Sequence, residues 1–98
     1  MRTTDILPGT AYEEITVSST AIGLTAAKFH EAERAVIQVQ LNPVRVRWDG
    51  GTPTSLVGVD YSAGEFIYLY GQRDMAQFLA IRTGADASLR VTYEGLTR

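Results

Sequence analysis

The residue types that most often carry out catalysis are scarce in this sequence of 98 residues, which contains one histidine, His30, and no cysteine. A serine nucleophile needs a neighbouring base, and the chain has no G-x-S-x-G turn that would present such a nucleophile. His30 lies beside a possible helical turn, close to Glu31 and Glu33. We therefore expect His30 to be a solvated surface residue and the protein not to be an enzyme.

The carboxylates are scattered along the chain and show no arrangement for acid–base catalysis. Asp49 and Asp60 could flank one end of a hairpin, but a glycosidase needs two carboxylates that face each other across a cleft. A thin sandwich leaves little room for a cleft, so we expect Asp49 to form a turn with Gly50 and Gly51. No spacing matches a calcium loop, a zinc site or a phosphate loop. We predict no metal and no cofactor.

The aromatic residues are more informative, because one predicted strand is apolar on both faces. Ile67 and Leu69 alternate there with Phe66, Tyr68 and Tyr70. A small sandwich buries only one face of each sheet, so we expect Ile67 and Leu69 to point into the core. The three aromatic side chains then contact either a loop or the N-terminal arm of the same subunit, or another molecule. Tyrosine-rich surface with little charge is typical of interfaces, and we predict an interface at Phe66, Tyr68 and Tyr70.

Trp48 is the single tryptophan of the chain. It continues the alternation of Val44 and Val46, which predicts that its indole points into the core. The alternative is that the ring forms a platform for a carbohydrate, since sugar-binding sites use exposed aromatic rings beside polar groups.

Composition and charge exclude several classes of partner. The formal net charge is −2, and Arg45 and Arg47 form a local pair without the basic patch of a nucleic-acid binder. No apolar run approaches the roughly 20 residues that cross a bilayer. The N-terminus lacks the apolar region of a signal peptide, so we expect synthesis in a cytoplasm. A small domain without disulfides relies on its core or on oligomerisation.

The periodicity of the sequence indicates a fold made almost entirely of short strands. Residues 1–12 have no clear period around the turn signal Pro8-Gly9, which predicts an irregular N-terminal arm, and residues 13–98 predict a single domain. The arm is either a frayed terminus or a segment that orders on a neighbouring subunit. Short helical segments are expected at 25–29, with Thr25 as the N-cap, and at 73–79. The expected strands cover residues 14–18, 34–41, 44–48, 55–59, 66–70, 80–82 and 88–93. This pattern predicts an all-β fold, a small antiparallel β-sandwich or jelly-roll-like barrel of six to seven strands with one or two short helical turns.

Four motifs follow one another along the chain. They read ITVSSTAIGLTAA at 15–27, RAVIQV at 34–39, VRVRWDGGTPT at 44–54 and FLAIRTGADASLRVTY at 78–93. Their order, over about residues 13–94, resembles a group of small β-sandwich proteins encoded among the virion genes of tailed bacteriophages. Compared with that group, the strand that carries Phe66, Tyr68 and Tyr70 is unusually apolar, which fits oligomerisation.

The resemblance implies a virion structural role, most naturally that of a head decoration (cement) protein. Such a protein binds the major capsid protein on the capsid surface as a homotrimer or homodimer. It stabilises the shell against the pressure of the packaged DNA. A tail or neck component is a close alternative. The resemblance carries no catalytic motif, and it implies synthesis in the cytoplasm of the bacterial host.

A second resemblance favours a different function. The segment 46–54, VRWDGGTPT, is similar to a motif of β-sandwich domains appended to glycoside hydrolases. A carbohydrate-binding or host-recognition module is therefore the alternative to a virion structural protein.

Overall fold

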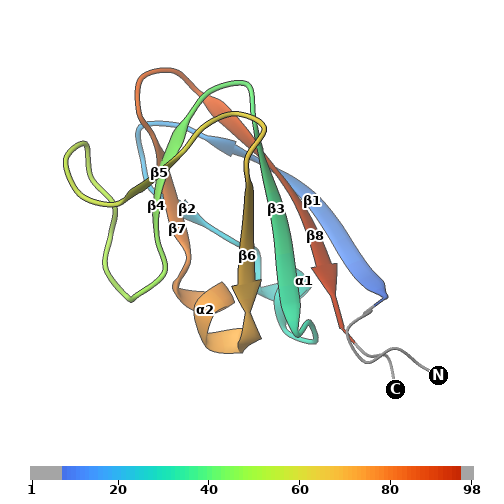
Figure 1. Cartoon of the computed structure of the whole chain (residues 1–98). Coiled ribbons are helices and arrows are strands. Elements are labelled where there is room, and N and C mark those ends of the chain that lie inside the picture. The colour runs from blue at the N-terminus through green and yellow to red at the C-terminus, as the bar shows by residue number, and fades with distance from the viewer. Residues whose placement is uncertain (1–7, 96–98) are drawn as a thin grey trace.

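Eight strands form two antiparallel four-stranded sheets in a computed structural model that describes residues 8–95 (Figure 1). The strands are β1 (Gly9–Val17), β2 (Ile22–Gly23), β3 (Arg34–Gln40), β4 (Val44–Arg47), β5 (Val59–Tyr61), β6 (Phe66–Tyr70), β7 (Leu79–Arg82) and β8 (Ala87–Glu94). Two short helices, α1 (Ala26–Phe29) and α2 (Gly71–Gln77), lie at one end of the sandwich. The side-chain amide of Gln72 joins them by donating to the carbonyls of Phe29 and Ala32, each at 2.6 Å.

The strands pair as a nested hairpin that is wound around the core. β1 pairs with β8, β2 with β7, β3 with β6 and β4 with β5, and these pairs alternate between the two sheets. The resulting orders, β1-β8-β3-β6 and β2-β7-β4-β5, are those of a jelly roll. The prediction of an antiparallel, jelly-roll-like sandwich is confirmed. The strand number is higher than predicted because β2 has only two residues, too few to show alternation.

The core lies between the sheets and follows the period of two along each strand. In β8 every second residue is buried, and in β3 the buried residues are Ala35, Ile37 and Val39. Ile67 and Leu69 of β6 are 2% and 0% exposed and pack in the same cluster. Their predicted orientation is therefore confirmed. Alternation places apolar side chains on one face of a strand, and burial of that face sets the register.

The N-terminal arm predicted for residues 1–12 is wrong for Gly9 to Tyr12, which belong to β1. These residues extend the pairing with β8 as far as Gly9 opposite Glu94, with a register shift between Gly9 and Ala11. Their side chains are mostly exposed, so they show little of the apolar alternation that marks a strand. The remainder of the predicted arm, residues 1–7, lies outside the described residues.

The strand predicted at 55–59 is also wrong, because the chain loops through 55–58 and β5 begins at Val59. The hydroxyl of Thr54 accepts hydrogen bonds from the backbone N–H groups of Leu56 and Val57 at 3.2 and 3.0 Å. Local bonds of this kind compete with strand pairing. Gly58 then adopts a φ of 143°, which L-residues rarely reach.

Smaller differences appear at the ends of elements. β3 stops one residue before Leu41, which is 72% exposed with a φ of 75°, where the expected strand would have buried it. α1 follows Thr25 as expected, but the Thr25 side chain makes no cap hydrogen bond. Its hydroxyl instead donates to Glu13 at 2.7 Å. α2 begins two residues earlier than expected, at Gly71.

Candidate interaction surface

The predicted interface residues lie on β6, which is an edge strand of its sheet. β6 alternates strictly, so that Phe66, Tyr68 and Tyr70 point away from the core with 48%, 51% and 62% of their surface exposed. The rings of Phe66 and Tyr68 stack along the strand with centroids 6.3 Å apart. We call these three side chains the aromatic row. The structure places them together on one exposed face.

The register of the sheet extends this surface across the neighbouring strands. Val36 of β3 lies beside Tyr68, Thr92 of β8 lies beside Val36, and Tyr12 of β1 lies beside Thr92. Tyr12 is half exposed, and its hydroxyl donates to Glu14 at 2.9 Å. The sequence interpretation missed Tyr12 because it fell in the predicted arm. The sequence did hold a signal for it: Tyr12 continues the alternation of Glu14 and Thr16, which places all three side chains on the same face of the strand.

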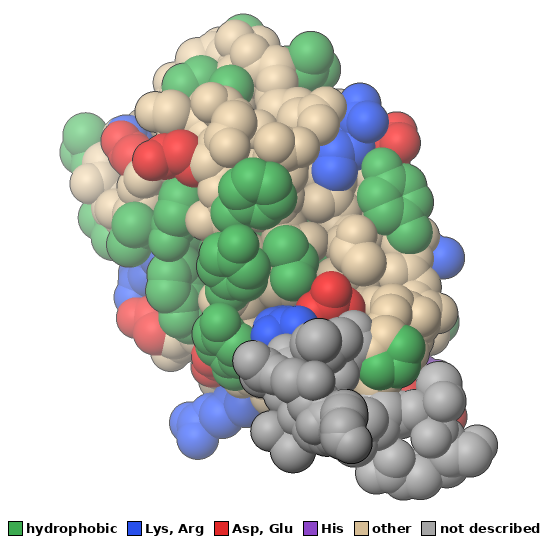
Figure 2. Space-filling model, turned by 45° about the vertical axis from the view of Figure 1, so that its right-hand side comes forward, with side chains coloured by type: hydrophobic (Ala, Val, Ile, Leu, Met, Phe, Trp, Pro, Cys, Tyr) green, Lys and Arg blue, Asp and Glu red, His purple; other side chains and the backbone are tan. Residues whose placement is uncertain are grey.

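The charged groups on this face neutralise one another. Arg34 contacts Glu94 at 2.5 Å, and Arg90 contacts Glu14 at 3.5 Å. Figure 2 shows hydrophobic side chains gathered along the surface, with basic and acidic side chains adjoining one another at its margins. The face therefore combines aromatic area with little net charge, which is the composition of many protein interfaces.

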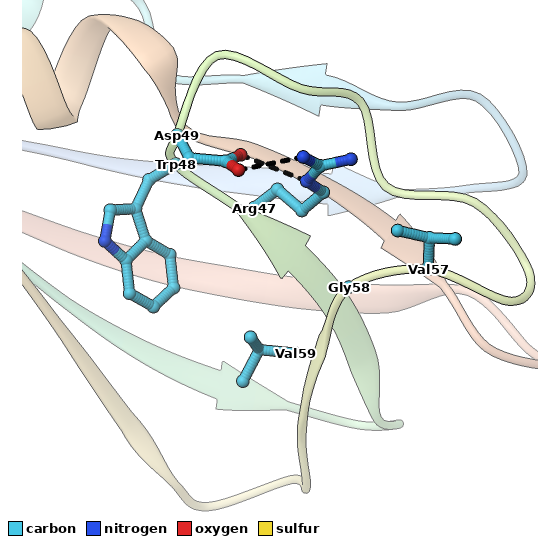
Figure 3. A pocket seen from close by; sticks show the side chains of 6 residues that line it. All are labelled: Arg47, Trp48, Asp49, Val57, Gly58 and Val59. Atoms are coloured by element: carbon cyan, nitrogen blue, oxygen red, sulfur yellow. Dashed lines mark hydrogen bonds and ion pairs between the residues drawn. The ribbon is translucent and has the colours of Figure 1, made fainter.

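A second surface feature is an open pocket of about 420 Å³ beside Trp48. Trp48 follows β4 and is partly buried against the core, so its predicted burial is only partial. The pairing of β4 ends at Arg47, and this leaves one side of the indole open. Val57 and Val59 line the pocket with it. In Figure 3 the indole and Val59 lie below the paired side chains of Arg47 and Asp49.

Asp49 is held as a carboxylate by its neighbours. Arg47 donates to its two oxygens at 3.0 and 2.8 Å, and the backbone N–H of Gly51 donates at 3.2 Å. The hydrogen bonds from Arg47 and then from Gly51 lower the pKa of Asp49 to about 2. The bond to Gly51 is that of a turn-forming aspartate, as the sequence predicted.

Asp60 has a separate partner and does not act together with Asp49. Arg45 donates to its carboxylate at 2.5 and 3.1 Å, and this hydrogen bonding lowers the pKa of Asp60. A general acid of a glycosidase needs a raised pKa. Asp49 and Asp60 are each bound to a different arginine, and both have a lowered pKa, whereas a general acid needs a raised one.

His30 lies on the surface, as predicted, with 68% of its side chain exposed and Glu31 at 3.6 Å. Among residues 8–95 no group of three or more histidine, aspartate and glutamate side chains is arranged to hold a metal ion. In the same range, neither helix has the length and apolar character needed to span a membrane.

No family model matches the sequence, and no curated protein or solved structure matches it either. The two surface features that can indicate a function are therefore the aromatic row and the Trp48 pocket. Charged groups are paired at both features: Arg34 contacts Glu94 beside the row, and Arg47 contacts Asp49 at the pocket. The row also exposes about half of each aromatic residue. The row carries three exposed aromatic side chains, whereas the exposed apolar side chains of the pocket are the smaller Val57 and Val59.

Proposed function

We propose that this protein is a structural component of a tailed-bacteriophage virion, a head decoration protein that oligomerises with itself and binds the major capsid protein on the shell surface. Its role is to stabilise the shell, with no catalytic step, cofactor, nucleic acid or membrane involved. The observation that carries the proposal is the aromatic row, three large side chains that are about half exposed on an edge strand. The order of the four sequence motifs supports the virion context.

The size of the row indicates how it contributes to assembly. An aromatic side chain can bury about 150–250 Å², and about half of each ring is exposed, so the row offers roughly 300 Å² per copy. A standard interface buries about 800 Å² per partner. The row therefore forms the centre of a larger contact, where aromatic anchors carry most of the binding energy. Repetition over many sites on a shell adds to the stabilisation, because each bound copy favours the assembled state.

Sedimentation velocity of the purified chain tests self-association. We expect an oligomer for the native sequence and a shift to monomer for Tyr68→Ser, which removes the central ring. Leu56→Ser is the matched control, because Leu56 is 90% exposed in the loop before β5, away from the aromatic row. A native protein that remains monomeric at its highest soluble concentration would overturn the self-association part of the proposal.

Co-sedimentation with empty phage heads tests the capsid part. The shells used are those of a tailed phage whose virion genes include the gene for this chain. We expect saturable binding of the native protein to intact shells and none to the dissociated capsid protein. Absence of binding to intact shells would overturn the proposed role in head decoration, even if the protein oligomerises.

The Trp48 pocket favours carbohydrate binding as a second candidate function. It joins an indole edge to a paired carboxylate and guanidinium, which are groups that recognise sugars. Because the chain has one tryptophan, its fluorescence reports on this site alone. We expect a ligand found on a glycan array to change that fluorescence and Trp48→Ala to abolish the binding. If no glycan on the array binds and added sugars leave the tryptophan fluorescence unchanged, this function is excluded.

A further inference from the structure

We propose that two copies of this chain join edge to edge through β6. Their β6 strands pair antiparallel about a twofold axis at Tyr68, and the two four-stranded sheets become one continuous sheet. This inference rests on the proposed self-association and names its partner, a second copy, and its geometry. It is carried by three observations: which backbone groups of β6 are free, how the other sheet edges are protected, and the symmetry of the β6 side chains.

The hydrogen bonds of β6 to β3 show which backbone groups remain free. The N–H of Gly71 donates to the carbonyl of Glu33, and the N–H of Val39 donates to the carbonyl of Glu65, both at 2.9 Å. In an antiparallel pair, residues alternate between those bonded to the partner strand and those whose N–H and C=O point away. Odd-numbered residues of β6 thus bond to β3. Phe66, Tyr68 and Tyr70 direct their N–H and C=O groups to the open edge.

No strand of residues 8–95 pairs with that open edge. The other three sheet edges carry features that discourage pairing with another chain. β1 has a register shift near its start and carries Glu13 and Glu14. β2 has two residues, and β5 has three, of which Asp60 is bound to Arg45. β6 has five residues with no charge, proline or register shift, so it is the unprotected edge.

The side chains of β6 are complementary to a second β6 in this arrangement. With Tyr68 opposite Tyr68, Phe66 faces Tyr70 and Ile67 faces Leu69. The residues that face each other on the outer side are those with free backbone groups, so each pair exchanges two N–H···O bonds. A shift by one residue would set free groups against groups already bonded to β3. The symmetric register therefore satisfies the largest number of backbone groups.

In the same register, each face of the new sheet places side chains of the same kind beside one another. On the outer face, the two aromatic rows lie side by side as cross-strand aromatic pairs. On the inner face, Ile67 and Leu69 extend the two apolar cores toward each other. At each end of the pair, Glu65 of one copy lies opposite Gly71 of the other, and nothing lies within 4 Å of the place where a Gly71 side chain would begin. That position leaves space for the carboxylate.

Amide hydrogen exchange on the native chain tests the pairing without any substitution. We expect the amides of Phe66, Tyr68 and Tyr70 to be protected at concentrations where the oligomer forms and to exchange rapidly after dilution to monomer. The amides of Ile67 and Leu69, which face β3, are the internal control and should be protected at both concentrations.

Single-cysteine crosslinking tests the register, because the chain has no cysteine of its own. In the proposed pair the two Tyr68 Cα atoms lie about 5.5 Å apart, within the span of a disulfide. Tyr68→Cys also removes the ring and weakens the pair, but oxidation at high protein concentration should still trap a covalent dimer, because the disulfide forms irreversibly each time the two β6 strands meet. Phe66→Cys is the matched control, since its two copies would lie four residues apart, about 13 Å along the strands. It should crosslink only when mixed with Tyr70→Cys.

The outcomes separate this inference from the proposed function. An oligomer in which the amides of Phe66, Tyr68 and Tyr70 exchange as fast as in the monomer would leave self-association intact and overturn the β6 pairing. Crosslinking of Phe66→Cys alone, as efficient as that of Tyr68→Cys, would overturn the register. Protection that appears only after capsid shells are added would assign the edge to the capsid protein and overturn the dimer.

Discussion

The hydroxyl of Tyr93 donates a hydrogen bond to the carboxylate of Glu13, and this contact joins β8 to β1 at the edge of the core. Tyr93 is fully buried. The same carboxylate accepts bonds from the hydroxyl and the backbone N–H of Thr25, at 2.7 and 3.2 Å. Glu13 therefore connects two strands to the start of α1, and its charge is satisfied by three donors.

This arrangement predicts a loss of stability at acid pH. Partial burial raises the pKa of Glu13, but hydrogen bonds from Tyr93 and Thr25 outweigh it, so the pKa lies below its ordinary value of 4.5. A lowered pKa in the folded state stabilises the protein above the unfolded-state pKa. That contribution is lost as the pH falls through the folded-state pKa. We expect urea unfolding between pH 7 and pH 3 to show a smaller loss of unfolding free energy for Glu13→Gln than for the native chain. Parallel pH profiles would contradict this role.

Tyr93→Phe should destabilise the fold, because it leaves a partly buried carboxylate without one donor. Hydrogen bonds to charged groups contribute about 1.5–3 kcal/mol, and we expect a loss of unfolding free energy in that range by urea titration. Tyr12→Phe is the control, since Tyr12 also donates to a glutamate but is half exposed. Its effect should stay within about 0.5 kcal/mol. If Tyr93→Phe lowers the unfolding free energy no more than Tyr12→Phe does, the hydrogen bond to Glu13 adds no stability.

Truncation of two neighbouring residues of β6 should destabilise the monomer to very different extents. Leu69 is fully buried, and Leu→Ala in a core costs about 2–5 kcal/mol. Tyr68 is half exposed, so Tyr68→Ala should cost under about 1 kcal/mol of monomer stability. Urea unfolding at a protein concentration low enough to keep the chain monomeric measures both values. A large loss for Tyr68→Ala under those conditions would mean that its ring packs within its own subunit.

Gly58→Ala should destabilise the loop before β5. Gly58 has a φ of 143°, and an added Cβ would lie 2.5 Å from Cγ of Arg45 and 3.1 Å from the carbonyl oxygen of Val46. A strained position of this kind costs about 1–3 kcal/mol. Gly84→Ala is the control, because nothing lies within 4 Å of its Cβ position and its φ is ordinary. Thermal unfolding should show a lower midpoint for Gly58→Ala only, and an unchanged midpoint would mean that the loop adopts another conformation.

The sequence by itself determined which side of most strands faces the core. Val39, Leu89 and Val91 alternate with polar residues, and alternation needs only the local geometry of a strand. The same period predicted that Ile67 and Leu69 are buried and that the aromatic row points outward. Local turn preferences predicted the turn at Asp49. The short alanine-rich run after Thr25 predicted the position of α1, although the Thr25 side chain makes no cap hydrogen bond.

Only the tertiary structure decided which strands pair and which strand lies at an edge. The position of β6 beside β3 depends on contacts between segments far apart in the chain, and so does the line from Tyr68 through Val36 to Tyr12. Glu13 shows the same limit, because its donors come from β8 and from the residue before α1. Local periodicity records the direction of a side chain, whereas long-range pairing determines what that side chain meets. For this reason the exposed aromatic strand was visible in the sequence, and its free edge was not.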